Sequence, residues 1–170
     1  MGVICNSSDK RKNSQETKVI SFNSLDNNIL YLHNFYRKKH NSPNLELNDE
    51  LCKMAKNYAK ESIINKNKEN IFKYNDEILG QNIYLSKIRP KQLEKVINEW
   101  YEENRNYDYN SKYYQKNAAH FTQIVWKETK EIGFGSAGEN NFCLVVFYYP
   151  AGNILGKFTE NVENPNKKKK

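Results

Sequence analysis

Apolar residues recur at helical spacing near the start of the chain. Ile29, Leu32 and Phe35-Tyr36 follow one another at steps of three and four. This spacing predicts an amphipathic helix from about residue 26, and Asn41-Ser42-Pro43 is a plausible end for it. A second apolar stripe follows Asn48, a residue type that caps helix N-termini. Its members are Leu51, Met54-Ala55, Tyr58-Ala59 and Ser62-Ile63.

Two further helices are predicted later in the chain. Pro90 suits the first turn of one of them, and its inward positions are Leu93, Val96-Ile97 and Trp100-Tyr101. The other is a short helix within residues 119–126. There, Phe121, Ile124 and Val125 anchor one face, while His120 and Gln123 point elsewhere.

The pattern changes from helical to strand-like towards the C-terminus. Residues 65–77 are polar and predict a loop. Phe142 to Tyr149 form a continuous apolar run, typical of a central strand buried on both faces. The turn at 150–153 leads to a predicted closing strand from Ile154 to Phe158. Helices early and strands late predict one α/β domain with α–β–α layers.

Composition and charge narrow the class of protein. The chain has 170 residues and a formal net charge of +7, but residues 1–20 and Lys167 to Lys170 carry most of this charge. The body is close to neutral, whereas a nucleic-acid binder usually carries a basic stripe on its fold. We therefore expect no nucleic-acid partner. The basic residues at both ends of the chain could attract it to an anionic membrane. The alternative is that these lysines only keep the protein soluble.

Cysteine usage and the N-terminus indicate the compartment. Cys5, Cys52 and Cys143 allow at most one internal bridge, which fits a reducing compartment. No apolar run has the length of a secretory signal or a membrane-spanning helix.

The N-terminal segment carries possible lipidation sites. Removal of Met1 exposes Gly2, a substrate for myristoylation, and Cys5 can take palmitate. Lys10-Arg11-Lys12 would add an electrostatic second signal, which one acyl chain needs for stable membrane binding. The usual pattern has Ser or Thr at position 6, where this chain has Asn6. The alternative is that the segment carries no modification. We expect the segment to be flexible in both cases.

Candidate chemistry centres on His120. Histidine near neutral pH can carry a proton or bind a metal, although a lone histidine is more often a packed core residue. His33 is expected to be a packed or hydrogen-bonded helix histidine. His40 is expected to be a cation at the negative end of its helix dipole. Glu103 lies three residues after Trp100, where its carboxylate can reach a cleft or stay solvated. The tyrosine-rich stretch 104–117 can form a binding rim or a variable loop.

Five stretches together resemble the CAP superfamily of cysteine-rich secretory, antigen 5 and plant pathogenesis-related proteins. They are His33–Arg37, Gly80–Ile83, Trp100–Glu103, His120–Trp126 and Tyr148–Asn153, in the order of that family. The few cysteines, the Pro-Ala-Gly-Asn turn and Gly2 are most similar to its Golgi-associated branch, whose members are cytosolic, myristoylated and membrane-attached. The resemblance implies a three-layer α–β–α sandwich with a mainly antiparallel central sheet. It divides the chain into a flexible segment 1–25, a CAP domain 26–163 and a basic segment 164–170.

The family cleft has two histidines that can bind zinc and two acids. The resemblance carries these positions onto Tyr74, Gln81, Glu103 and His120, with an uncertainty of one or two residues at Tyr74. Because Gln81 replaces an acid and Tyr74 a histidine, we expect no cofactor and weak or absent zinc binding. Gln81 can still hydrogen-bond an imidazole, which would keep the cleft as a polar network.

The sequence thus favours a non-enzymatic, lipid-anchored protein on the cytoplasmic face of Golgi or plasma membranes. The expected partners are membrane lipids, including anionic lipids or sterols, or a protein; a homodimer stays open. One alternative is a hydrolase or protease that uses His120 as a base and Glu103 to orient it. The other is a secreted defence-type ligand, as in much of the family.

Overall fold

The computed structural model describes residues 24–64 and 71–166, with side chains from residue 28 onwards. Its helices are α1 (Ser24–Lys39), α2 (Asp49–Ile64), α3 (Glu94–Glu102), α4 (Ala119–Val125) and α5 (Phe158–Asn161). Its strands are β1 (Glu46–Leu47), β2 (Lys73–Tyr74), β3 (Glu77–Ile78), β4 (Gly80–Ile88), β5 (Glu131–Ala137) and β6 (Asn140–Tyr149). Two short 3-10 turns, Glu103–Asn106 and Lys116–Ala118, precede α4.

The main sheet has the strand order β1-β5-β6-β4. Strand β6 pairs antiparallel with both β4 and β5, and only the two-residue β1 runs parallel to its neighbour β5. The predictions of a mainly antiparallel sheet and of a central apolar strand over residues 142–149 are confirmed. Strands β2 and β3 form a separate hairpin.

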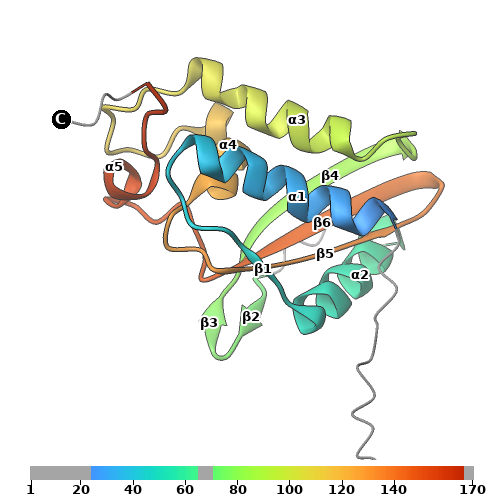
Figure 1. Cartoon of the computed structure of the whole chain (residues 1–170). Coiled ribbons are helices and arrows are strands. Elements are labelled where there is room, and N and C mark those ends of the chain that lie inside the picture. Colours follow the sequence, from blue (N-terminus) through green and yellow to red (C-terminus); the bar gives the residue numbers. More distant parts are fainter. Residues whose placement is uncertain (1–23, 65–70, 167–170) are drawn as a thin grey trace, which may run out of the picture.

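The alternating side chains of β6 build two cores, one on each face of the sheet. Phe142, Leu144, Val146 and Tyr148 belong to the core under α1, α3 and α4. On the other face Cys143, Val145 and Phe147 pack with Leu51, Ala55 and Ala59 of α2. Figure 1 shows α2 on one side of the sheet and the other long helices on the opposite side. This arrangement confirms the three-layer sandwich.

Asn48 begins α2 as predicted. Its Oδ1 atom accepts hydrogen bonds from the backbone N–H groups of Glu50 (2.9 Å) and Leu51 (3.1 Å). The cap thus satisfies two N–H groups that a helix start otherwise leaves without partners. Its Nδ2 atom also donates to the Tyr74 hydroxyl at 3.2 Å, which ties the helix start to the β2–β3 hairpin.

The predicted loop over residues 65–77 contains ordered hairpin structure in its described part. Asn75 and Asp76 form the turn between β2 and β3, with φ values of 50° and 64°. Both residues tolerate this left-handed conformation, and positive φ at both central positions is the requirement of a tight two-residue hairpin turn. The polar composition of residues 65–77 predicted only a loop, although the Asn75-Asp76 pair is typical of a hairpin turn.

Two predicted boundaries near the chain's later elements are wrong. Helix α3 begins at Glu94, not at Pro90, because the backbone N–H of Arg89 still bonds to the Glu139 carbonyl (2.9 Å) and continues the extended chain. The predicted closing strand over residues 154–158 is absent. Gly156 instead turns the chain at φ 83°, and the short helix α5 follows and buries Phe158.

Arg37, on the inner side of α1, is fully buried with its guanidinium surrounded by backbone carbonyls. It donates to the carbonyls of Pro43 (2.7 Å), Ile124 (3.0 Å), Trp126 (2.8 Å) and Thr129 (2.9 Å). Burial lowers its pKa to about 10, so the side chain stays charged at neutral pH. One side chain therefore joins α1 to the loop after it and to the end of α4.

His33 in α1 and His40, the residue directly after the helix, are both buried. His33 donates from Nδ1 to the Ile29 carbonyl (2.8 Å) and accepts at Nε2 from the Tyr148 hydroxyl (2.8 Å), as expected for a packed histidine. His40 bonds to the Glu163 carbonyl and to the Tyr101 hydroxyl. Burial lowers the pKa of His40, which opposes the expected cation at the helix end. That expectation is wrong, because the chain after residue 158 covers the end of α1.

His33 should make the stability of the domain depend on pH. Burial lowers its pKa from 6.5 to about 4, a shift that the neighbouring Arg37 charge assists. The unfolded chain therefore binds the proton more tightly, so stability is unaffected above pH 6.5 and falls between pH 6.5 and about 4. The expected loss of unfolding free energy across that window is roughly 3 kcal/mol.

Urea unfolding of wild type and His33→Gln across this pH range measures the effect. The variant should be less stable at neutral pH but should lose less stability on acidification. Equal slopes in the two proteins would assign the acid sensitivity to other groups.

Candidate functional site

His120 lies in the first turn of α4, which the sequence pattern placed correctly. Phe121, Ile124 and Val125 are completely buried and fix the helix against the core, as predicted. Gln123 does not point away from the core as expected. It is buried, and its Oε1 atom accepts the Gly152 backbone N–H at 3.0 Å.

Glu103 joins the end of α3 to the start of α4. Its Oε2 atom accepts the backbone N–H groups of His120 (3.0 Å) and Phe121 (3.1 Å). Its Oε1 atom lies 2.6 Å from His120 Nδ1. A carboxylate at the first N–H groups of a helix is stabilised both by hydrogen bonds and by the helix dipole. Glu103 therefore acts as the cap of α4 and as the hydrogen-bond partner of the imidazole.

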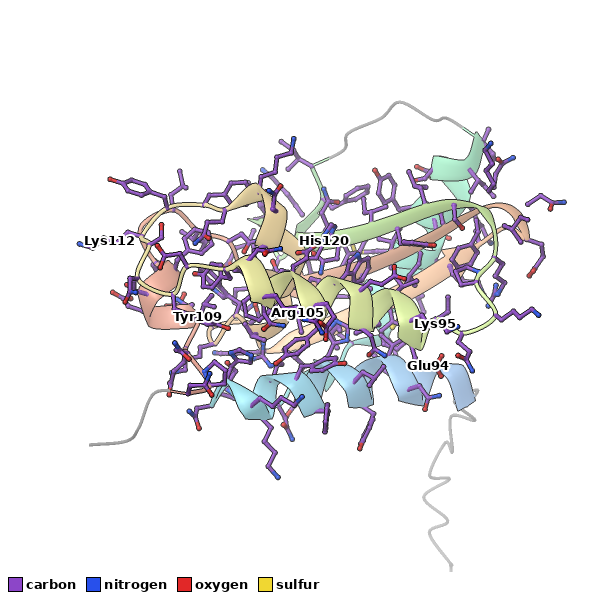
Figure 2. All side chains as sticks on the ribbon, turned by 90° about the horizontal axis from the view of Figure 1, so that it is seen from above. Glu94, Lys95, Arg105, Tyr109, Lys112 and His120 are labelled. Carbon is purple, nitrogen blue, oxygen red and sulfur yellow. The ribbon has the colours of Figure 1, made fainter. Side chains whose placement is uncertain are left out.

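The imidazole of His120 is positioned by ring stacking as well as by the hydrogen bond at Nδ1. The Trp100 ring stacks on it with centroids 5.2 Å apart and planes 9° from parallel. Because Nδ1 donates to the carboxylate in the neutral ring, Nε2 is the nitrogen with a lone pair. The side chain is 38% exposed and lies between α3 and β4 in Figure 2. The pair can thus accept a proton or offer one nitrogen ligand.

Asn82 links this pair to the buried histidine of α1. Its Nδ2 atom donates to the His120 carbonyl (3.1 Å) and to the Tyr148 hydroxyl (3.2 Å), and that hydroxyl in turn donates to His33. Asn82 is buried. The resulting chain of polar groups crosses the core from α4 to α1.

Tyr74 and Gln81 lie apart from the His120–Glu103 pair. Tyr74 packs edge-on against Tyr149 (centroids 5.2 Å apart) at the core under α2. Gln81 is exposed and pairs in register with Phe147, whose side chain faces α2. Neither residue forms a hydrogen bond or ring contact with His120 or Glu103 within the described residues. The polar network expected through Gln81 runs through Asn82 instead.

The alternation of β4 could have revealed this difference. Successive strand residues face opposite sides of a sheet, so Gln81 and Asn82 cannot both reach the same imidazole-bearing helix. Trp100 was recognised only as an inward helix position, and its stacking on His120 required the relative placement of α3 and α4.

The donor set of this site does not fit zinc. Structural and catalytic zinc sites normally use three or four protein ligands, and His120 Nε2 is a single nitrogen donor here. In the parts of the chain that the structure describes, no group of three His, Cys, Asp or Glu residues can hold a metal ion. Weak or absent zinc binding therefore stays our prediction.

A zinc titration of the purified protein tests it. We expect no binding with a sub-micromolar dissociation constant, because one imidazole cannot supply the affinity of a chelating set. Sub-micromolar binding that His120→Ala abolishes would contradict the prediction.

Removal of the Glu103 carboxylate should destabilise the domain. Glu103→Ala leaves two helix N–H groups without their acceptor and is expected to cost about 2 kcal/mol. Glu102→Ala, at the preceding exposed position, is the matched control and should change stability by less than about 0.5 kcal/mol. Chemical denaturation measures the free energy of unfolding of both variants. Equal losses in the two variants would contradict the capping role of Glu103.

The three-layer α–β–α sandwich on a mainly antiparallel sheet is the architecture that the resemblance to the CAP superfamily implies. The family model for the cysteine-rich secretory protein family matches residues 30–149. The chain belongs to this family. Its members are generally not enzymes.

Individual relatives agree with this assignment. The human protein named Golgi-associated plant pathogenesis-related protein 1 is 34% identical over 149 residues, which cover 83% of this chain and 94% of the human protein. Venom allergen 5 of Polistes dominula is 36% identical over 129 residues, which cover 69% of this chain and 56% of the allergen.

Solved structures with low sequence identity share the fold. Na-ASP-1 superposes with a TM-score of 0.64 at 19% identity, covering 89% of this chain and 45% of that one. MpPR-1i superposes with a TM-score of 0.59 at 22% identity, covering 83% and 96%.

The cysteines and the helices of the described chain bear on the expected compartment and membrane contact. Cys52 and Cys143 form no disulfide. No helix among the described residues is both long and apolar enough to cross a membrane. Gly2 and Cys5 lie outside the described residues.

Proposed function

We propose that this chain is a non-enzymatic CAP-domain protein that an acyl chain on Gly2 holds at the cytoplasmic face of a membrane. The observation that carries the proposal is the N-terminal sequence, in which Gly2, Cys5 and Lys10-Arg11-Lys12 stand together. One acyl chain binds a membrane only marginally, and either a second chain on Cys5 or the basic residues would make the attachment stable. The name of the human relative, Golgi-associated plant pathogenesis-related protein 1, supports a Golgi membrane.

The geometry of the pair supports a role without catalysis. Both oxygens of Glu103 serve the start of α4, so this carboxylate positions a helix. No serine or cysteine of the described chain is hydrogen bonded to His120, so the site presents no activated nucleophile. His120 and Glu103 then act as a structural link between the end of α3 and the start of α4.

Flotation with vesicles tests the anchor. Full-length protein produced together with an N-myristoyltransferase should float with vesicles that contain phosphatidylserine, whereas Gly2→Ala should float much less. Asn6→Ser restores the usual acylation pattern and should increase the acylated fraction if Asn6 limits it. Equal flotation of wild type and Gly2→Ala would reject the anchor.

A second candidate function is hydrolysis, favoured by the orientation of the pair. Glu103 fixes Nδ1 of His120 and leaves Nε2 as the basic nitrogen, the arrangement a general base needs. Hydrolysis of ester or peptide substrates that His120→Gln abolishes, with the fold retained, would support it. The secreted alternative would be supported by recovery of the protein from culture medium.

A further inference from the structure

One end of the fold combines exposed apolar residues with unpaired cations. The last turn of α2 and the end of β4 meet there around a cavity of about 350 Å³, whose lining includes Ile63, Leu85, Lys87 and Phe142. Leu85 is 63% exposed, Ile88 73% and Ile64 77%. Three large aliphatic side chains exposed at one end of the fold are unusual on a free surface and indicate an interaction site.

The charges at this end are mainly positive. Lys87 and Lys91 are exposed and form no hydrogen bond or ion pair with another described residue. Arg89 is paired with Glu139, and its guanidinium lies 5.2 Å from the centre of the Phe142 ring. Lys60 and Glu61 in the last turns of α2, and Glu94 and Lys95 at the start of α3, add two charges of each sign. The free charge of this end is therefore cationic.

The N-terminal segment joins the fold at the same end. Helix α1 begins at Ser24, and the Asn28 side chain donates to Glu94 at the start of α3 (2.6 Å). Because α3 follows β4 by five residues, the start of α1 lies beside the end of β4. In Figures 1 and 2 the beginning of α1, the end of α2 and the end of β4 all lie at one end of the molecule.

We propose that this end, defined by Ile64, Leu85, Lys87, Ile88 and Lys91 and here called the α2–β4 end, is the surface that docks on an anionic membrane. Aliphatic side chains that enter the interface, with lysines beside them for lipid phosphates, are the composition that binds such a surface. Helix α1 begins at this end of the fold, so the acylated segment that precedes it in the sequence joins the domain beside the proposed surface. The cavity offers the end of a lipid acyl chain an apolar place between Ile63 and Leu85. The inference rests on the proposed membrane association and names the face that makes it.

Vesicle binding of full-length, N-myristoylated protein tests the surface with matched variants. Lys87→Gln/Lys91→Gln should weaken binding to phosphatidylcholine vesicles containing phosphatidylserine about tenfold, with little effect on vesicles of phosphatidylcholine alone. Leu85→Ser/Ile88→Ser should weaken binding about tenfold on both kinds of vesicle. The first control is Lys112→Gln/Lys116→Gln, in which both lysines are exposed and Lys112 lies at the opposite end in Figure 2. The second control is Ile154→Ser/Leu155→Ser, at two exposed positions. They should bind as wild type does.

Hydrogen exchange locates the contact independently of any variant. Vesicles should protect peptides that cover residues 60–64 and 83–91, but not residues 153–157. If the variants at the α2–β4 end and the control variants weaken vesicle binding equally, the docking surface is wrong. The anchor would still hold in that case if Gly2→Ala binds vesicles less than wild type does. If wild type and Gly2→Ala float with vesicles equally well, the anchor itself is rejected. Protection of the same peptides without vesicles, at concentrations where sedimentation shows a dimer, would assign this end to a second copy and overturn the membrane contact.

Discussion

Replacement of Arg37 by methionine is expected to lower the free energy of unfolding by about 4 kcal/mol or more. Methionine fills part of the volume but donates no hydrogen bond. The carbonyls of Pro43, Ile124, Trp126 and Thr129 would then lose the guanidinium as a donor, although the Trp126 carbonyl still accepts the Thr129 backbone N–H. Urea unfolding followed by circular dichroism measures the loss. If the variant fails to fold, the prediction is met in its extreme form.

Two substitutions serve as controls for this prediction. Arg37→Lys keeps the charge but offers three donors from one nitrogen, which cannot reach carbonyls arranged around a planar guanidinium. It should recover little of the lost stability. Lys38→Met, at the next and exposed position of α1, should change stability by less than about 0.5 kcal/mol. A stability of Arg37→Met close to that of Lys38→Met would contradict the structural role of the guanidinium.

Gly133→Ala is expected to destabilise the domain by about 3 kcal/mol. Helix α2 crosses β5 so closely that a Cβ atom on Gly133 would overlap Leu51 Cβ, the Leu51 carbonyl carbon and the Cys52 backbone nitrogen. Two of these three atoms belong to the backbone of a helix, so no rotamer change relieves the overlap. The helix must instead move away from the sheet.

A double variant separates this explanation from ordinary side-chain crowding. Leu51→Ala removes the end of the leucine but keeps its Cβ and backbone, so Gly133→Ala/Leu51→Ala should show no rescue. Ser136→Ala, on the same strand but facing the other layer, should be nearly neutral. Denaturation midpoints of the single and double variants test both points. Recovery of stability in the double variant would mean that side-chain volume, not helix position, causes the effect.

The sequence was informative about the fold where burial alone sets the pattern. The stripe of α2 and the run from Phe142 to Tyr149 are apolar because each packs against a layer of the sandwich, and both were predicted correctly. Failures occurred where tertiary contacts outweigh local composition. His40 looked like an exposed helix-end cation, but residues from α5 onwards return and cover it. The stretch from Ile154 to Phe158 has strand-like composition, yet Gly156 turns it away from the sheet.

The candidate site was predictable only in part. The pairing of His120 with Glu103, first suggested by the family resemblance, is present at 2.6 Å. The same resemblance grouped Tyr74 and Gln81 with this pair, although the pleat of β4 turns Gln81 towards α2. Asn82 takes the linking position because the next residue along a strand faces the other layer. Side-chain direction, rather than residue identity, limited what the sequence could predict.

The most direct test of the lipid anchor is the intact mass of the protein recovered from the membrane fraction of its native cells. We predict a chain without Met1 that carries an acyl chain on Gly2, with or without a second chain on Cys5. Fragmentation of the N-terminal peptide assigns each modification to its residue. An unmodified mass in the membrane fraction, or recovery of the protein only from the soluble fraction, would contradict the lipid anchor.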